Sequence, residues 1–287
     1  MNAKVVGILA ILGASIMWAI EPILAKLSYL NSNFLETSTI RAFVVVFIAL
    51  IYVFITNKGN LRVNQKQFSA LVYIALVATL FADLIYFYAI AKIPVINAVL
   101  IGHMQPIFII LIGFFILKED KLTKFDYFGI FFMLVAGLLV TTKTLTNLSM
   151  LKLGTFGDLL VLSATIAWST TAIAMRKYLK NINAGVVTFY RYLIASIAFL
   201  IYSLQTSSIS VSNIYQILVG IVVGVGTILY YEGLKRIKAA QVSALELTTP
   251  FFAAILGFLI LREIITIMQF SGILLMFLGV HFLSRKE

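Results

Sequence analysis

Long apolar segments separated by short polar breaks run from one end of the chain to the other. A helix that crosses the hydrocarbon core of a bilayer needs about 20 mainly apolar residues. The pattern predicts ten such helices, and the third and fourth nearly adjoin, which predicts a tight helical hairpin. Their expected bounds are Val5–Leu27, Leu35–Ile55, Phe68–Ile90, Val95–Leu117, Phe125–Thr142, Phe156–Met175, Val186–Leu204, Ile214–Leu234, Ala240–Leu261 and Ile267–Leu283.

The composition agrees with lipid as the solvent of this chain. Of its 287 residues, 62% are hydrophobic and only 11% are charged, whereas soluble domains are nearer one half apolar and one quarter charged. The first apolar segment contains Glu21-Pro22 and is longer than the hydrophobic region of a signal peptide, so it is interpreted as a span. The chain is therefore predicted to be an all-α integral membrane protein.

Basic residues are distributed unevenly over the predicted loops. If the N-terminus is cytoplasmic, 15 lysines and arginines lie on the inner side and five on the outer side. Because cytoplasmic loops carry the excess of Lys and Arg, both termini are predicted to be cytoplasmic. The inner residues are Lys4, Lys58, Arg62, Lys66, Lys118, Lys121, Lys124, Arg176, Lys177, Lys180, Lys235, Arg236, Lys238, Arg285 and Lys286, and the outer ones are Lys26, Lys92, Lys143, Lys152 and Arg262. This scatter over short loops argues against a nucleic-acid-binding patch, despite the net charge of +11.

The two halves of the chain share an internal repeat. At an offset of 150, Gly7, Trp18, Lys26 and Arg41 recur as Gly157, Trp168, Arg176 and Arg191. At an offset of 144, Tyr86, Pro106, Gly113 and Glu119 recur as Tyr230, Pro250, Gly257 and Glu263, and 8 of 28 positions agree between 92–119 and 236–263. The predicted units are residues 1–146 and 152–287. Each holds five spans, an odd number, so the second unit enters the membrane inverted, as in many secondary transporters.

The motifs of these halves resemble one family. Ile85-Tyr-Phe-Tyr-Ala-Ile-Ala-Lys-Ile93, Pro106 and the stretch from Gly113 to Glu119 are similar to an EamA repeat of the drug/metabolite transporter superfamily. Leu229-Tyr-Tyr-Glu-Gly-Leu-Lys-Arg-Ile237, Pro250 and the stretch from Gly257 to Glu263 resemble a second one. The resemblance implies ten spans in two inverted five-helix repeats. It also implies a central cavity lined by spans 1, 3, 4, 6, 8 and 9, and transport of amino acids or other small metabolites, often outward.

Ionisable side chains in the middle of predicted spans are the first candidates for a solute path, because each costs at least ~2.5 kcal/mol at the bilayer centre. Glu21, Asp83, His103 and Glu246 occupy such positions. Small or polar residues follow them at helical spacing, which also suits simple helix packing. His103 also has a purely structural alternative, because a lone histidine can hydrogen-bond across helices.

Repeated aromatic residues and prolines complete the candidate site. Trp18 with Trp168, and Tyr86 with Tyr230, are expected either to grip a hydrophobic or cationic part of a solute or to pack as ordinary core. Pro106 and Pro250 lie inside spans and should kink or unwind them near His103 and Glu246. The predicted substrate-binding residues are Trp18, Glu21, Asp83, Tyr86, His103, Trp168, Tyr230 and Glu246.

Other repeated residues are assigned structural roles. Arg41 and Arg191 begin spans 2 and 7, and Glu119 and Glu263 end spans 4 and 9, so ion pairs or snorkelling to the interface are expected. Close helix packing is expected at a further set of glycines. These are Gly113, Gly129, Gly137, Gly257, Gly272 and Gly279.

The leading hypothesis is a secondary transporter of amino acids or other small polar metabolites in a prokaryotic inner membrane, working by alternating access. Export is the expected direction, with proton coupling or exchange both open. A channel or facilitator is the alternative, although no filter-like loop is evident. The chain contains no Cys and no phosphate loop, and His103 has no Gly-x-Ser-x-Gly companion, so neither an enzyme nor a cofactor or metal is expected. The expected partners are a small solute and lipid, and the protein is expected to be a monomer or homodimer.

Overall fold

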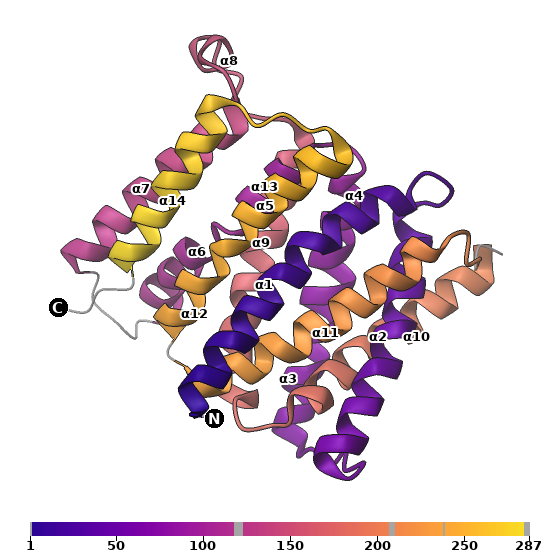
Figure 1. Cartoon of the computed structure of the whole chain (residues 1–287). Coiled ribbons are helices and arrows are strands. Elements are labelled where there is room, and N and C mark those ends of the chain that lie inside the picture. Colours follow the sequence, from indigo (N-terminus) through magenta and orange to yellow (C-terminus); the bar gives the residue numbers. More distant parts are fainter. Residues whose placement is uncertain (1, 118–122, 207–209, 238, 284–287) are drawn as a thin grey trace.

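The computed structural model describes residues 2–117, 123–206, 210–237 and 239–283 (Figure 1). Within these ranges every regular element is a helix, and there is no strand. The first half contains α1 (Ala3–Ser28), α2 (Phe34–Asn57), α3 (Gln65–Ile74), η1 (Ala75–Asp83), α4 (Leu84–Ile90), α5 (Val95–Gly102), α6 (Gln105–Ile112), η2 (Gly113–Leu117), α7 (Lys124–Thr142) and the short α8 (Leu145–Ser149). The second contains α9 (Phe156–Ala174), η3 (Met175–Leu179), α10 (Ala184–Thr206), α11 (Ile214–Arg236), α12 (Ala239–Glu246), α13 (Thr248–Leu261) and α14 (Ile267–Leu283).

Eight helical segments of the described chain are long and apolar enough to cross a bilayer, and two shorter apolar helices, α13 and α14, follow them. Large apolar side chains point outward as well as inward: Phe54 and Phe115 are each 67% exposed. Such side chains would be costly in water and are at no disadvantage in hydrocarbon. The structure therefore has the surface of a multi-pass membrane protein.

Polar breaks in the sequence start the helices by capping them. Asn33, Asn64, Thr123 and Thr155 precede α2, α3, α7 and α9, and each side chain accepts a hydrogen bond from a backbone N–H of the first turn. These bonds satisfy N–H groups that a helix cannot pair internally. Short polar segments thus both end one span and begin the next.

The two prolines break their spans as predicted. α5 ends at Gly102 and α6 begins at Gln105, while α12 ends at Glu246 and α13 begins at Thr248. Proline has no N–H to offer and its ring clashes with the carbonyl four residues earlier. In these two spans, Pro106 and Pro250 therefore free the carbonyls of Gly102 and Glu246 in the middle of the helix bundle.

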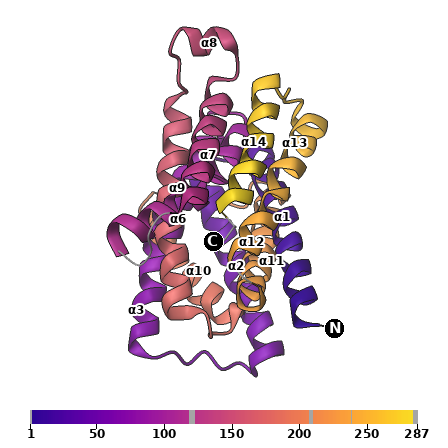
Figure 2. The same cartoon turned by 90° about the vertical axis from the view of Figure 1, so that its left-hand side faces the viewer.

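Helices of the first half pack along helices of the second half and so hold the bundle together. α1 packs along α11, α2 packs against α10 and α11, and α9 packs against η1, α4, α5 and α6. α7 and α14 run side by side at one edge of the bundle, as the two views agree (Figures 1 and 2). α8 lies at the opposite end of the molecule from the N-terminus (Figure 1).

Glycines bring α7 and α14 together. A Cβ atom added to Gly129 would lie 2.9 Å from the carbonyl oxygen of Gly279, and one added to Gly272 would lie 3.1 Å from that of Ala136. Such approaches leave no room for a side chain, so the prediction of close packing is confirmed for these spans. It is wrong for Gly113, because no atom of the described residues lies within 4 Å of a Cβ built there.

Candidate functional site

A cavity of about 170 Å³ lies in the middle of the bundle, between helices of both halves. All eight side chains predicted from the sequence line it: Trp18, Glu21, Asp83, Tyr86, His103, Trp168, Tyr230 and Glu246. They come from α1, η1, α4, α9, α11, α12 and the α5–α6 break. The cavity is comparable with the ~150 Å³ space that holds a benzene molecule in an engineered protein. It has room for a small solute.

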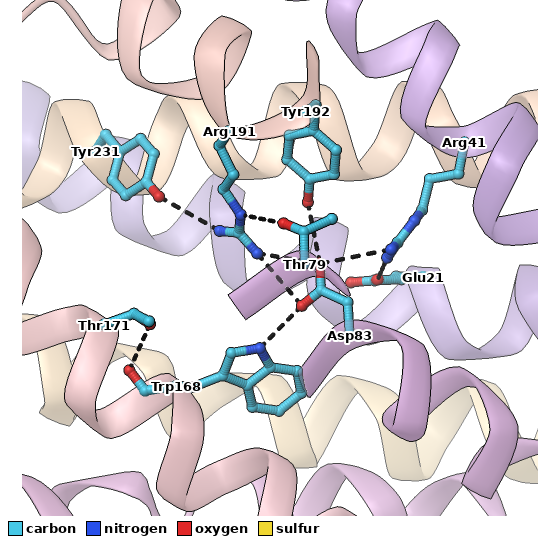
Figure 3. A network of polar contacts seen from close by, with 9 residues as sticks. All are labelled: Glu21, Arg41, Thr79, Asp83, Trp168, Thr171, Arg191, Tyr192 and Tyr231. Atoms are coloured by element: carbon cyan, nitrogen blue, oxygen red, sulfur yellow. Dashed lines mark hydrogen bonds and ion pairs between the residues drawn. The ribbon is translucent and has the colours of Figure 1, made fainter. Parts of the chain in front are cut away.

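Asp83 is the centre of a buried polar network (Figure 3). Its carboxylate accepts hydrogen bonds from Arg191 Nη2 at 3.0 Å, from the Trp168 indole N–H at 2.8 Å and from the Tyr192 hydroxyl at 3.4 Å. Arg41 Nη2 lies 3.5 Å from the same carboxylate. Two guanidinium groups thus share one carboxylate, and the resulting excess of positive charge needs a second acid.

Glu21 supplies that second acid. Its Oε1 lies 3.5 Å from Arg41 Nη1, so two carboxylates balance two guanidinium groups. Arg191 also donates to the Thr79 hydroxyl at 2.8 Å and to the Tyr231 hydroxyl at 3.3 Å. We refer to these eight residues as the Asp83 network. They are Glu21, Arg41, Thr79, Asp83, Trp168, Arg191, Tyr192 and Tyr231.

The two arginines form ion pairs rather than reaching the membrane surface. The Arg41 side chain is 1% exposed and its guanidinium lies 4.2 Å from the ring centroid of Phe87. The Arg191 side chain is 13% exposed. The ion-pair alternative is therefore confirmed for both residues, and the snorkelling alternative is wrong. Planar guanidinium groups suit this role because they combine several donors with a face that stacks on aromatic rings.

The repeated aromatic residues pair across the two halves. Trp18 lies against Tyr230 with ring centroids 4.8 Å apart, and Trp168 lies against Tyr86 at 5.2 Å. Each tryptophan of one half thus contacts the tyrosine of the other half. One tilted pair and one edge-on pair of rings result on the cavity wall, an arrangement that favours an apolar or cationic group between them.

His103 and Glu246 lie where the prolines break their spans. His103 Nδ1 is 2.7 Å from the carbonyl oxygen of Val99 in its own helix, so its bond does not cross between helices. Glu246 is the last residue of α12. Among the residues that the structure describes, its side chain has neither a hydrogen bond nor an ion pair, and Arg176 is the charged group that acts on it electrostatically.

Arg176 is a cavity residue that the sequence interpretation missed. It was assigned to a cytoplasmic loop, but it lies in η3, which continues the α9 span, and it lines the cavity. Its position 150 residues after Lys26 was the available signal. Arg191 also lines the cavity, and it was assigned only a structural role.

An ion pair joins α1 to the segment after α13 at one end of the bundle. Lys26 Nζ lies 2.9 Å from Glu263 Oε1 and donates to the Ile93 carbonyl at 3.1 Å. Glu263 also accepts from the backbone N–H groups of Val95 and Ile96, at 2.9 and 3.2 Å, at the start of α5. This contact set, which we call the Lys26–Glu263 latch, confirms the ion pair expected for Glu263. Its counterpart Glu119 lies outside the described residues.

A metal site is not formed by the part of the chain that the structure describes: it contains no group of three or more His, Cys, Asp or Glu side chains that could hold an ion.

A second polar cluster, away from the cavity, connects helices to one another. Asn97 donates to Asp158 at 3.0 Å and accepts from Gln269 at 2.6 Å, which joins α5, α9 and α14 away from the cavity.

Comparisons with known proteins agree with this architecture. The sequence profile of the EamA-like transporter family matches residues 5–142 and again residues 155–285. An uncharacterised transporter of Methanothermobacter thermautotrophicus is 28% identical over 237 residues, 80% of this chain and 68% of that protein. The uncharacterised inner membrane transporter YhbE of Escherichia coli K12 is 27% identical over 257 residues, 86% of this chain and 78% of that protein.

The fold is also similar to that of a solved crystal structure. The two superpose with a TM-score of 0.67 over 98% of this chain and 96% of the other, at 17% sequence identity. At that identity the likeness concerns the fold alone.

Proposed function

This chain belongs to the EamA-like transporter family, and from that premise we propose that it is a secondary transporter of amino acids or other small polar metabolites. It is a multi-pass cell membrane protein that handles a small solute, and family members are transporters rather than enzymes. We further propose export as its direction, and a monomer or homodimer as its state. Coupling to protons and exchange of solutes are both compatible with the proposal.

The observation that carries the proposal is one central cavity that is closed at one end. Buried apolar residues fill the helical turns between the cavity and the Lys26–Glu263 latch: Ile23, Ile90 and Ile96 are each at most 1% exposed. Toward the other end the cavity wall extends to Arg176, in the last turns of its span. Alternating access requires such an asymmetry, because the site must open to one side at a time.

The repeat supports a second state. The proposed architecture is ten spans in two inverted five-helix units, residues 1–146 and 152–287, with both termini in the cytoplasm. The crossed aromatic pairs fit this arrangement, since the Trp18–Tyr230 contact becomes the Trp168–Tyr86 contact when the halves are exchanged. Rocking of one unit against the other would open the latch end and close the opposite end.

Counterflow in proteoliposomes tests the function. Vesicles with purified protein are preloaded with a mixture of amino acids and small metabolites, and each labelled solute is then added outside at tracer concentration. Saturable, transient accumulation of a tracer above its equilibrium level is expected, because a carrier exchanges solute faster than net flux dissipates it. Vesicles without protein are the control.

A channel or facilitator is the second candidate, and the same experiment separates the two. A channel equilibrates tracer without accumulating it, since its path is open to both sides at once. The latch favours the carrier because it joins α1, the start of α5 and the segment after α13 across one end of the bundle. Equilibration without accumulation would contradict our proposal.

The proposed topology is testable without preparatory mutagenesis because the chain has no Cys. Single cysteines at Asn60, between α2 and α3, and at Ser149, in α8, lie in breaks at opposite ends of the molecule. A membrane-impermeant maleimide added to intact cells is expected to label Ser149→Cys and to spare Asn60→Cys. The reverse labelling would invert the proposed orientation.

A further inference from the structure

We propose that Arg176 and Glu246 form a binding site for a small zwitterion. In this site the guanidinium of Arg176 takes the anionic group of the solute, and the carboxylate of Glu246 takes its cationic group. The proposal rests on the proposed transport function, since it concerns the solute carried through the same cavity. It adds the charge pattern of the solute and the two side chains that recognise it.

Among the described residues, some charged side chains of the cavity wall form ion pairs and others do not. Asp83, Arg191 and Glu21 are held by the Asp83 network, at distances of 3.0–3.5 Å. Arg176 and Glu246 also line the cavity, yet neither has a hydrogen bond or ion pair with any part of the chain that the structure describes. They are close enough to act on each other electrostatically but do not form an ion pair. A gap remains between two opposite charges.

Charged groups left in this state point to a ligand. Ionisable side chains inside a membrane protein are costly and ordinarily face a partner or a solute path. A solute with both charges satisfies Arg176 and Glu246 together. A simple amine would leave Arg176 uncompensated, and a simple carboxylic acid would leave Glu246 uncompensated, so either must bind less tightly.

The aromatic pairs define where the rest of the solute lies. Trp18 and Tyr230 line the same cavity as Glu246, and Tyr230 is close enough to Glu246 for the two to interact electrostatically. An ammonium group at Glu246 would therefore lie beside aromatic faces, which attract cations. The Tyr86–Trp168 pair offers a second apolar wall, and the volume of about 170 Å³ limits the solute to the size of a common amino acid.

The test compares three probes with the same carbon skeleton: leucine, its decarboxylated amine 3-methylbutylamine, and its deaminated acid 4-methylpentanoate. Each is assayed for stabilisation of the purified protein against heat and for competition with counterflow of pooled labelled amino acids. The zwitterion is expected to bind at least tenfold more tightly than either analogue. Equal binding of the amine, the acid and the zwitterion would overturn the proposal.

Two substitutions test which side chain binds which charged group of the solute. Glu246→Gln and Arg176→Gln are each expected to weaken leucine binding at least tenfold. Glu246→Gln should strengthen the weak binding of the acid, because no carboxylate is then left uncompensated, and Arg176→Gln should strengthen that of the amine for the matching reason. Lys177→Gln is the matched control, because Lys177 is the exposed neighbour of Arg176, and it should change nothing. Glu246→Asp should retain part of the affinity.

The outcomes separate this site from the transport proposal. Normal leucine binding in both glutamine variants would reject the site while counterflow still supported a carrier. Conversely, charge-dependent stabilisation by leucine without any counterflow would support the site and reject the carrier. Unchanged melting temperatures of the ligand-free variants are required, since a purely structural role for either residue would lower them.

Discussion

Two groups of charges lie within one cavity wall, and they differ in what surrounds them. In the Asp83 network every charge has an opposite charge within 3.5 Å, and aromatic or hydroxyl groups occupy further hydrogen-bonding positions. Arg176 and Glu246 have no such partners among the described residues. Satisfied charges hold helices in place, whereas unsatisfied ones are available to a solute. We infer that architecture and recognition are divided between the two groups.

The Asp83 network is suited to holding helices because its charges come from four elements. Glu21 lies in α1, Arg41 in α2, Asp83 in η1 and Arg191 in α10, so the first half and the second half meet at one carboxylate. A buried ion pair is weak evidence of net stabilisation, but the removal of one partner leaves an uncompensated buried charge. Substitutions in this network should therefore act on folding first.

The largest expected effect comes from Asp83→Asn. The change is nearly isosteric but leaves the guanidinium groups of Arg41 and Arg191 with one carboxylate between them. Loss of one partner from a buried ion pair costs about 3–5 kcal/mol. We expect a matching fall in the free energy of unfolding, measured by thermal denaturation of the purified protein in detergent.

Thr227 provides the matched control for this prediction. It occupies the equivalent position in the second half, 144 residues later, and is also buried and cavity-lining. Thr227→Val should cost far less, because no ion pair is broken. Adding Arg191→Gln to Asp83→Asn should restore part of the lost stability, since the two residues are coupled. An Asp83→Asn protein as stable as the wild type would place Asp83 with the available charges instead.

A smaller effect is expected from Trp168→Phe. The substitution removes the indole N–H that donates to Asp83 Oδ1 at 2.8 Å. A hydrogen bond to a charged group contributes about 1.5–3 kcal/mol. Trp18→Phe removes a similar ring area at the repeat-related position without touching the Asp83 network. The difference between the two variants in unfolding free energy therefore isolates the hydrogen bond.

Transport measurements on Trp168→Phe and Trp18→Phe test whether the residues that hold the helices and those that bind the solute are separate. Trp18 lines the side of the cavity that we assign to the solute, together with Tyr230 and Glu246. Trp18→Phe should thus weaken solute binding with little loss of stability, and Trp168→Phe should do the opposite. Equal loss of stability in both variants would contradict a special role for the Trp168 bond.

The sequence was sufficient to predict the cavity wall but not its chemistry. Spans, the breaks at Pro106 and Pro250, and the eight candidate side chains follow from apolar length, helical spacing and the repeat, whereas the central cavity that they line is what the resemblance to the EamA family implies. Which charges neutralise one another depends on tertiary contacts. Arg191 lies 108 residues from Asp83, and nothing in the spacing selects that pairing.

Arg176 shows why span edges limit such predictions. The ends of the predicted spans were placed at the charged residues themselves, so a charge inside the last turns of a span was assigned to the loop. In the structure, η3 continues to Leu179 and carries Arg176 into the cavity wall. The divisions into α5–α6 and α12–α13, by contrast, agree with the breaks predicted at Pro106 and Pro250.

The smallest expected effect concerns the Lys26–Glu263 latch, which lies outside both charge groups and is partly exposed, with side-chain exposures of 30% and 13%. Glu263→Gln removes the negative charge that Lys26 and two backbone N–H groups share. For a partly exposed pair, the loss of this charge costs about 1 kcal/mol, which is about a fivefold increase in the population of the state open at the latch end.

A single cysteine at Val99, which lines the cavity and is 2% exposed, reports that opening through its rate of labelling by an impermeant maleimide from the latch side. We expect about fivefold faster labelling in Glu263→Gln. No change is expected in Glu36→Gln, which alters a carboxylate at the same end of the bundle, in the first turn of α2. Labelling that is unchanged or slower in Glu263→Gln would mean that the buried isoleucines, rather than the ion pair, keep this end closed.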